Sequence, residues 1–275
     1  MNPNKKLGNQ RLEIGIRLKP EEYLVDLIRG GLKLIESRSG YHFTMDAVLL
    51  AHFVTVKSGD RVADLGSGSG IIPLLLNTRL PDLSIWGIEI QENLLDRARR
   101  SVAINGLQQQ IDLQHGDLRE IPAKIPAADF EVVVSNPPYR PLRRGRSSPC
   151  QEVAWAREEV SSTLGEVINS GYWLLRTGGR LALVHLWERR QEVVDLLLRY
   201  GMRPVRYREV RHNQQLAPSR FLVEAIKMRT ASMVDFPGAG ELDPERAIEL
   251  ARMEPLVIYE MTGEFTSEVK AMYYG

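Results

Sequence analysis

A glycine-rich turn between an apolar strand and a helix constrains the fold of this chain more than any other feature. Residues 61–70 read Arg-Val-Ala-Asp-Leu-Gly-Ser-Gly-Ser-Gly, and residues 71–80 continue as a predicted helix with Pro73 in its first turn. Proline is tolerated there because the first helical N–H groups have no intrahelical partner. The glycines allow positive φ angles and a close approach of the backbone to a ligand. Strand, glycine-rich turn and helix in this order are typical of nucleotide-binding α/β folds.

Four successive predicted strands end in, or run directly into, a polar side chain. Ligands of open α/β sheets bind at these carboxyl ends, where a carboxylate can accept hydrogen bonds from ribose hydroxyls or an amino group. Simpler interpretations are a strand-end charge for Glu89 and a capping box of Asp117 with Glu120. The recurrence at four strand ends favours a ligand site. Its residues are Asp64, Glu89 in residues 84–90, Asp117 at the end of residues 111–117, and Asn136 after residues 130–135.

The fourth predicted strand runs into Asn136, Pro137, Pro138 and Tyr139. The Asn136 side-chain oxygen and the Pro137 carbonyl offer two acceptors for the two N–H bonds of an exocyclic amine or carboxamide, and Pro138 keeps Pro137 out of a helix. Such a nitrogen shares its lone pair with a π-system, so it must be repositioned before it attacks a sulfonium methyl. Tyr139 adds an aromatic face on which a planar group can stack. The simpler interpretation is a turn after a strand.

These motifs together resemble the class I S-adenosylmethionine-dependent methyltransferases of the amino-methylating branch, which carry an Asn-Pro-Pro-Tyr motif. More narrowly, the chain resembles the bacterial adenine-N6 methyltransferases that modify the adenosine beside the anticodon of a valine tRNA. The resemblance covers residues 30–228. It implies an α/β, Rossmann-like sheet of seven mostly parallel strands with one antiparallel strand and helices on both faces.

The resemblance also assigns roles to the strand-end residues. Asp64 and the glycine loop would line the methionine end of S-adenosylmethionine, Glu89 would hold the ribose and Asp117 the adenine, and the product would be S-adenosylhomocysteine. No metal ion is expected. The expected cofactor-binding residues are Asp64, Gly66, Gly68, Gly70, Glu89, Asp117, Asn136 and Thr44, and the expected catalytic residues are Asn136, Pro137 and Tyr139.

Thr44 belongs to a segment, residues 41–46, that precedes a predicted helix over residues 47–54. The segment resembles the family element that closes over the cofactor from the N-terminal side. The simpler interpretation makes Thr44 the N-cap of this helix, with Asp46 in its first turn.

Local charge suggests the class of acceptor. The formal net charge of +1 argues against a chain that is basic all over. A loop rich in guanidinium beside the target site can nevertheless hold phosphates around an extruded base; the simpler interpretation is a solvated loop without a special role. We expect an RNA substrate, and a tRNA by resemblance. The loop arginines are Arg140, Arg143, Arg144 and Arg146, and a second group of Arg203, Arg206, Arg208 and Arg211 lies near the predicted sixth strand.

Other acceptors and other classes of protein remain as alternatives. The same motif serves methylation of a glutamine side-chain nitrogen in release factors, but those enzymes usually carry a large helical domain, for which the residues before Phe43 leave no room. Guanine-N2 in RNA is a further possible acceptor. A dinucleotide oxidoreductase gives no role to Asn136 or Tyr139, and a pure RNA-binding module does not need Glu89 and Asp117 at the strand ends.

The rest of the chain predicts a catalytic domain with appendages. We expect an N-terminal extension over residues 1–40, the methyltransferase domain over residues 41–229 and a tail over residues 230–275. A pair of strands joined only by a loop must be antiparallel. The predicted elements are helices over residues 155–175 and 188–200, strands over residues 180–186, 203–210 and 220–228, a turn at residues 177–179, and in the tail helices over residues 244–253 and 267–274 flanking a strand over residues 256–260.

Composition agrees with a cytoplasmic enzyme. The chain has 275 residues with 43% hydrophobic and 26% charged residues, no apolar run of membrane-spanning length and a polar N-terminus unlike a signal peptide. The single cysteine, Cys150, excludes an intramolecular disulfide and fits a reducing compartment. Cys150 follows Pro149, as in the nucleophile motif of cytosine-C5 methyltransferases. In those enzymes that pair occupies the place of Asn136 here, so we interpret Cys150 as incidental.

Overall fold

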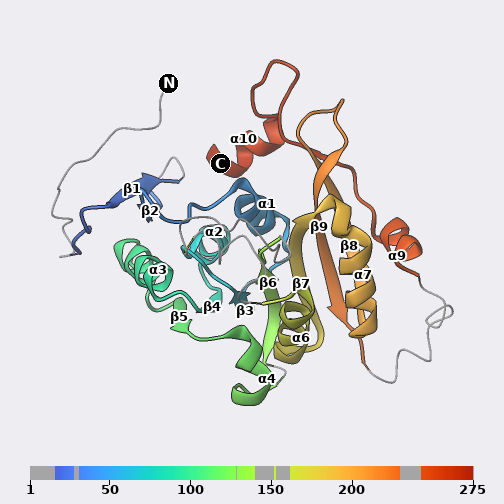
Figure 1. The fold of residues 1–275 in the computed structure, drawn as a ribbon, viewed down its shortest axis with the longest axis horizontal. Helices are drawn as coiled ribbons and strands as arrows, with labels where there is room; N and C mark the ends of the chain where they lie inside the picture. The colour runs from blue at the N-terminus through green and yellow to red at the C-terminus, as the bar shows by residue number, and fades with distance from the viewer. Residues whose placement is uncertain are drawn as a thin grey trace, which may run out of the picture.

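The computed structural model of the chain describes residues 16–27, 31–127, 129–139, 152, 162–229 and 243–274 (Figure 1). Its centre is an eight-stranded sheet, with a separate two-stranded hairpin beside it. The sheet strands are β3 (Arg61–Leu65), β4 (Ser84–Glu89), β5 (Ile111–His115), β6 (Phe130–Ser135), β7 (Leu175–Leu186), β8 (Met202–Arg211), β9 (Pro218–Lys227) and β10 (Leu256–Val257), and the hairpin strands are β1 (Glu22–Asp26) and β2 (Lys33–Ser37).

The strand order β10-β8-β9-β7-β6-β3-β4-β5 confirms the predicted fold class. In the described part of the sheet only β9 is reversed, since it pairs antiparallel with both β7 and β8 whereas the other neighbours pair in parallel. The predicted count of seven strands was too low by one. The tail strand β10 adds to the outer edge of β8 through Leu256 opposite Val210 and Val257 opposite Arg211. The sequence predicted a strand over residues 256–260 in the tail, but a pairing of only two residues gave no indication that this strand joins the sheet.

Helices cover both faces of the sheet (Figure 1). Alternate strand residues point to opposite faces, so Val62 packs in the core beneath α1, α2 and α3, while Ala63 packs in the core on the other side, with α6 and α7. The helices are α1 (Met45–Phe53), α2 (Ile71–Arg79), α3 (Glu92–Ile104), α4 (Ile121–Lys124), α6 (Leu164–Leu174), α7 (Arg190–Arg199), α9 (Pro244–Ala251) and α10 (Ser267–Tyr274), with short 3-10 turns η1 (Leu118–Glu120) and η2 (Trp187–Arg189).

Local sequence explains where several elements begin and end. Helix α2 starts directly after its N-cap residue Gly70, which has a left-handed backbone conformation with a φ of 78°. Helix α6 starts at a capping box formed by Thr163 and Glu166, so it is shorter than predicted; residues 155–161 lie outside the described residues. The turn predicted at residues 177–179 is instead a bulge inside β7. Leu175 pairs with Phe130, and the next paired residue of β7 is Arg180, opposite Val132, so β7 carries extra unpaired residues at this point.

The hairpin β1–β2, which the sequence did not predict, is fastened to α3. The backbone N–H of Ile35 donates to Ser101 Oγ at 2.9 Å, and that of Lys33 donates to Asn105 Oδ1 at 2.9 Å. Arg100 pairs with the buried Glu22 at 2.5 Å. The boundaries predicted after residues 40 and 229 stay predictions.

The described residues contain no helix that is both long and apolar enough to cross a membrane. Within the same part of the chain, no three histidine, cysteine, aspartate or glutamate side chains gather in a way that could hold a metal ion.

Candidate functional site

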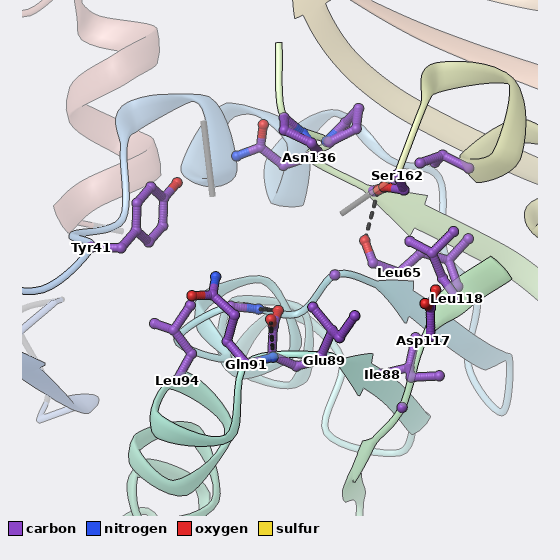
Figure 2. Close-up of a pocket in the computed structure, with 18 residues that line it drawn as sticks. Tyr41, Leu65, Ile88, Glu89, Gln91, Leu94, Asp117, Leu118, Asn136 and Ser162 are labelled. Carbon is purple, nitrogen blue, oxygen red and sulfur yellow. Dashed lines mark hydrogen bonds between the residues drawn. The ribbon is translucent and has the colours of Figure 1, made fainter. Parts of the chain in front are cut away.

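A pocket opens at the carboxyl ends of β3, β4, β5 and β6 (Figure 2). The empty space in and at the mouth of this pocket measures about 650 Å³, part of which is open solvent. Strand-end residues from all four strands meet there, as parallel neighbours require. Of the residues predicted from the sequence, the pocket is lined by Gly66, Gly68, Glu89, Asp117, Asn136 and Pro137; Asp64, Gly70, Thr44 and Tyr139 lie outside the lining.

The glycine-rich turn forms the wall after β3. Gly66, Gly68 and Gly70 have φ angles of 75°, 54° and 78°, which L side chains rarely adopt. Gly87 on the neighbouring strand lacks a side chain for a different reason, since a Cβ there would lie 2.3 Å from Ser67 Oγ. Gly87 was not predicted as part of the site, because its role depends on the pairing of β3 with β4.

Glu89 joins the turn to the pocket floor. Its side chain accepts hydrogen bonds from the backbone N–H groups of Gly68 at 2.8 Å and Gln91 at 2.9 Å. Burial raises the pKa of the Glu89 carboxyl, and the backbone hydrogen bonds act in the opposite direction. Each carboxylate oxygen has two lone-pair positions, so both can accept one further hydrogen bond from a ligand in the pocket.

Asp64 lies beneath the turn and is fully buried. Neither carboxylate oxygen has a hydrogen-bond partner among the described residues, and burial raises the pKa of the carboxyl to about 7. A buried carboxylate without a partner is unfavourable. The residue therefore suits a cationic or N–H-bearing ligand group that approaches the glycine turn, such as the amino group of a methionine moiety.

Replacing Asp64 by Asn should stabilise the protein at alkaline pH. The folded protein keeps the Asp64 proton between the ordinary pKa of 3.8 and about 7, a range in which the unfolded chain has lost it. The free energy of unfolding therefore falls as pH rises through this window and stays low above it. We expect urea unfolding at pH 8 to show Asp64→Asn more stable by a few kcal/mol, with a flatter pH dependence. An unchanged pH slope would contradict this; Asp129→Asn, on an exposed side chain, is the control.

Asp117 lines the pocket while it also caps a helix (Figure 2). It accepts a hydrogen bond from the Arg119 backbone N–H at 2.9 Å, which confirms the N-cap position. The alternative interpretation of a capping box is not met in full, because the Glu120 side chain pairs with Lys124 at 2.6 Å. The Arg119 guanidinium holds the pKa of Asp117 below its ordinary value, so the residue presents a carboxylate to the pocket.

Asn136, Pro137 and Pro138 form the opposite wall. The strand end before them is fixed because Ser135 Oγ donates to the Leu65 carbonyl at 2.7 Å. This bond joins β6 to β3 directly below the glycine turn. Asn136 and Pro137 thus face the same pocket as Glu89, as the sequence predicted.

Tyr139 lies behind Asn136 rather than in the pocket lining. Its hydroxyl contacts Asn136 Oδ1 and lies 3.0 Å from Asp46 Oδ2. The guanidinium carbon of Arg220 lies 5.3 Å from the ring centroid, and the His185 ring meets the Tyr139 ring edge-on at 5.2 Å. The stacking role predicted for Tyr139 stays a prediction, and a base that stacks on the face covered by Arg220 must displace that guanidinium.

Sequence reasoning did not find His185 and Arg220, and it treated Asp46 only as a helix-start residue. These residues come from β7, β9 and α1. They meet only because β9 inserts between β8 and β7. Asp46 was visible as an acidic residue of the first helical turn, and Thr44 occupies the N-cap without a side-chain capping bond.

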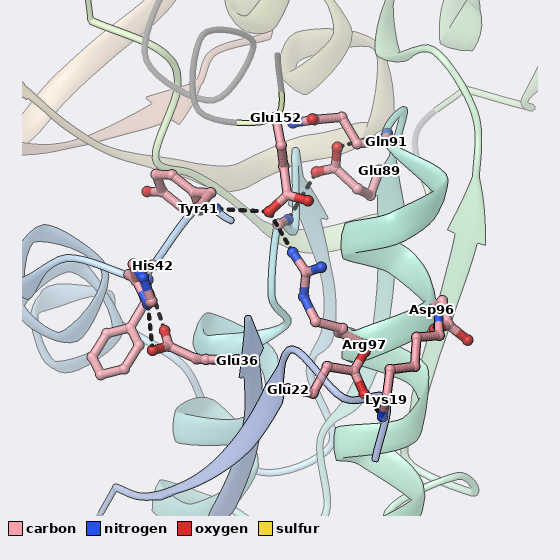
Figure 3. Close-up of polar contacts among 12 residues, drawn as sticks. Lys19, Glu22, Glu36, Tyr41, His42, Glu89, Gln91, Asp96, Arg97 and Glu152 are labelled. Carbon is pink, nitrogen blue, oxygen red and sulfur yellow. Dashed lines mark hydrogen bonds and ion pairs between the residues drawn. The ribbon is translucent and has the colours of Figure 1, made fainter. Parts of the chain in front are cut away.

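A partly buried ion pair lies at the remaining edge of the pocket (Figure 3). Glu152 pairs with Arg97 of α3 and accepts a hydrogen bond from the Tyr41 backbone N–H at 2.7 Å. A Cβ on Gly40 would lie 2.4 Å from the Glu152 carboxylate, so a side chain at this position would displace that carboxylate. The bonds hold the Tyr41 side chain at the pocket (Figure 2).

The two groups of arginines differ. Arg140, Arg143, Arg144 and Arg146 lie outside the described residues. In the second group, Arg206 donates to the Phe53 carbonyl at 2.6 Å, Arg208 forms a bidentate pair with Glu268, and Arg211 pairs with Glu209. These three side chains therefore stabilise the fold.

Two proteins with similar sequences are named as methyltransferases. The chain is 29% identical over 192 residues to a protein of Porphyromonas gingivalis named tRNA1(Val) (adenine(37)-N6)-methyltransferase, an alignment that covers 66% of this chain and 74% of that protein. A protein of the same name from Bacteroides thetaiotaomicron is 28% identical over 229 residues, which cover 82% of this chain and 90% of that protein.

Solved structures and a family match agree with these relatives. A predicted O-methyltransferase from Agrobacterium tumefaciens has a TM-score of 0.63 at 21% identity over 83% of this chain and 95% of that one, which shows a shared fold. Residues 44–200 match the family described as Methyltransferase small domain, a span that holds every pocket wall except Tyr41. The chain therefore belongs to the Methyltransferase small domain family and is an S-adenosylmethionine-dependent methyltransferase.

Proposed function

We propose that this protein transfers the methyl group of S-adenosylmethionine to the N6 amino group of an adenine in tRNA, beside the anticodon of a valine tRNA. The observation that carries the proposal is that Asn136 and Pro137 face the same pocket as Glu89. The names of the relatives support the choice of adenine and tRNA. A tRNA substrate implies a cytoplasmic enzyme.

The cofactor would bind along the strand ends. Glu89 would accept hydrogen bonds from the ribose hydroxyls with the lone pairs that its backbone bonds leave free, and Asp117 would accept one from the adenine amino group. Asp64 would pair with the methionine amino group beside the glycine turn. The bound cofactor supplies a sulfonium methyl, an electrophilic carbon that is ready for displacement.

The target amine would be held opposite this methyl by two acceptors. With its N–H bonds directed to the Asn136 side chain and the Pro137 carbonyl, the nitrogen turns its lone pair toward the methyl carbon. Transfer of the methyl group from the bound cofactor would form the N–C bond while the C–S bond electrons stay with sulfur, giving S-adenosylhomocysteine as the product. The alkylated nitrogen then loses a proton to water. Burial lowers the pKa of His185 to about 3, so this histidine is a poor base for that proton.

One labelling experiment tests the acceptor. The protein is incubated with methyl-labelled S-adenosylmethionine and with total RNA and total protein from cells that lack it. We expect the label on an N6-methyladenosine beside the anticodon of a valine tRNA. Label on a glutamine side chain or on guanine-N2 would contradict the proposal while leaving the amine chemistry intact.

The arginines after Tyr139 give a separate prediction about RNA. Neutralising Arg143 and Arg144 together to Gln should weaken tRNA binding and reduce the slope of log affinity against log salt by about 1 to 2, as the loss of two phosphate contacts requires. The control is Arg176→Gln with Arg199→Gln, two exposed side chains on other elements. Equal salt slopes for the two double variants, measured by titration of labelled tRNA, would exclude this loop from phosphate binding.

A further inference from the structure

The Tyr139 hydroxyl stands between two acceptor oxygens but carries one proton. Asp46 Oδ2 lies 3.0 Å away, and Asn136 Oδ1 is in contact on the other side. Burial raises the pKa of Tyr139 well above its ordinary value, so the hydroxyl keeps its proton at neutral pH. It can therefore donate to only one of its two neighbours.

Asp46 is the stronger acceptor of that proton. Its side chain is 14% exposed and forms an ion pair with Arg220, whose Nε lies 3.3 Å from the same Oδ2 atom. A hydrogen bond to a carboxylate is roughly twice as strong as one to a neutral amide. His185 does not compete, because its Nδ1 atom already accepts the Leu186 N–H at 2.9 Å and its neutral ring then carries a proton on Nε2.

With its proton directed to Asp46, the Tyr139 oxygen offers only lone pairs to Asn136. An amide oxygen facing these lone pairs is repelled, whereas an amide N–H is attracted. Rotation of the amide by 180° exchanges its oxygen and nitrogen, two atoms that differ little in size. The rotated amide donates from Nδ2 to the Tyr139 oxygen and turns Oδ1 away from the tyrosine.

We propose that Asp46 is a positioning residue that selects the reactive orientation of Asn136: it holds the Tyr139 proton, so the Tyr139 oxygen binds Asn136 Nδ2 and the amide oxygen is left for the target amine. The proposal rests on the proposed amine methylation, since only an N–H-bearing substrate needs the oxygen. An Asn136 amide that turned its nitrogen toward the substrate would place its own N–H donors against the N–H donors of the target amine.

The proposal predicts that the effect of Tyr139→Phe on kcat reverses its sign when Asp46 is absent. Without Asp46, the Tyr139 hydroxyl donates to Asn136 Oδ1 and traps the amide in the unreactive orientation, so Asp46→Ala should lower kcat roughly tenfold or more. Tyr139→Phe alone should lower kcat by a smaller factor, because the amide loses its support. In the Asp46→Ala background, however, Tyr139→Phe should raise kcat several-fold, because it removes the trap.

The test measures kcat and the KM for S-adenosylmethionine for both single variants and the double variant, with the unfolding midpoint of each. Asp129→Ala, which also frees an arginine, and Tyr172→Phe, a hydroxyl removed from α6, are the matched controls. A rise in kcat from the Asp46→Ala variant to the double variant, at unchanged KM, supports the proposal. A double variant no more active than Asp46→Ala overturns it and leaves Asp46 with a structural role.

A second measurement is independent of activity. In 1H–15N spectra, the Asn136 side-chain NH2 signals are assigned by their loss in Asn136→Ala. We expect one Nδ2 proton to exchange slowly with solvent in the wild type, and to lose this protection in both Tyr139→Phe and Asp46→Ala. Equal exchange in all three proteins overturns the inference. A wild type that shows the protected proton but does not methylate tRNA would instead contradict the proposed acceptor alone.

Discussion

Asn136→Ala is expected to lower kcat about a hundredfold or more, as the loss of one preorganised polar partner in an active site does. The amide lies at the end of β6, where Ser135 fixes the strand to β3, and it faces the pocket. Without it, the target nitrogen keeps one acceptor and no longer presents its lone pair in line with the methyl group. Cofactor affinity should stay within a few-fold, because Glu89 and the glycine turn are untouched. Single-turnover rates and cofactor titrations separate the two quantities.

Asn105→Ala is the matched control for this variant. Its amide supports the hairpin by accepting from the Lys33 N–H, at the far end of α3 from the pocket. It should lower the unfolding midpoint and leave kcat nearly unchanged. If Asn136→Ala kept wild-type turnover with an intact fold, the amine-holding role of the Asn-Pro-Pro-Tyr segment would be wrong.

Glu89→Ala should show the opposite pattern. If Glu89 accepts hydrogen bonds from the ribose hydroxyls as proposed, its loss should weaken S-adenosylmethionine binding by roughly tenfold to a hundredfold, while turnover at saturating cofactor changes less. Part of the loss comes from the glycine turn, because Glu89 also accepts the Gly68 N–H. Glu89→Gln keeps an oxygen for that bond and should lose less affinity than Glu89→Ala.

Isothermal titration of these variants with the cofactor measures the effect. Glu249→Ala, an exposed member of an ion pair on α9, serves as the control and should bind like the wild type. Wild-type affinity in Glu89→Ala would remove this residue from the cofactor site.

Local signals predicted the half of the fold around the glycine turn. Gly70 ends the turn where the sequence placed it, and β6 has the predicted bounds because an apolar β-branched run is cut by Asn136 and two prolines. Glu89 ends β4 as the alternation of strand and helix predicted, whereas β5 ends at His115, two residues before the predicted end at Asp117. Both residues nevertheless line the pocket. These features depend on sequence neighbours, so the sequence alone could show them.

What the sequence did not show depends on pairing between distant segments. Strand β10 joins the sheet through two residues of the tail, and the hairpin β1–β2 is held mainly by side chains of α3. The contacts of Tyr139 also join distant segments. Arg220 of β9 lies over its ring, and Asp46 of α1 lies beside its hydroxyl. Periodicity reports which face of a strand is buried, and it carries no information about which distant strand lies beside it.

The most direct test of the account is a crystal structure of the protein with sinefungin, an analogue that carries an amine in place of the sulfonium methyl. We expect the ribose hydroxyls on Glu89, the adenine amino group at Asp117, and the analogue's amine facing the Asn136 side chain and the Pro137 carbonyl. An analogue bound elsewhere, or bound with that amine directed away from Asn136, would contradict it.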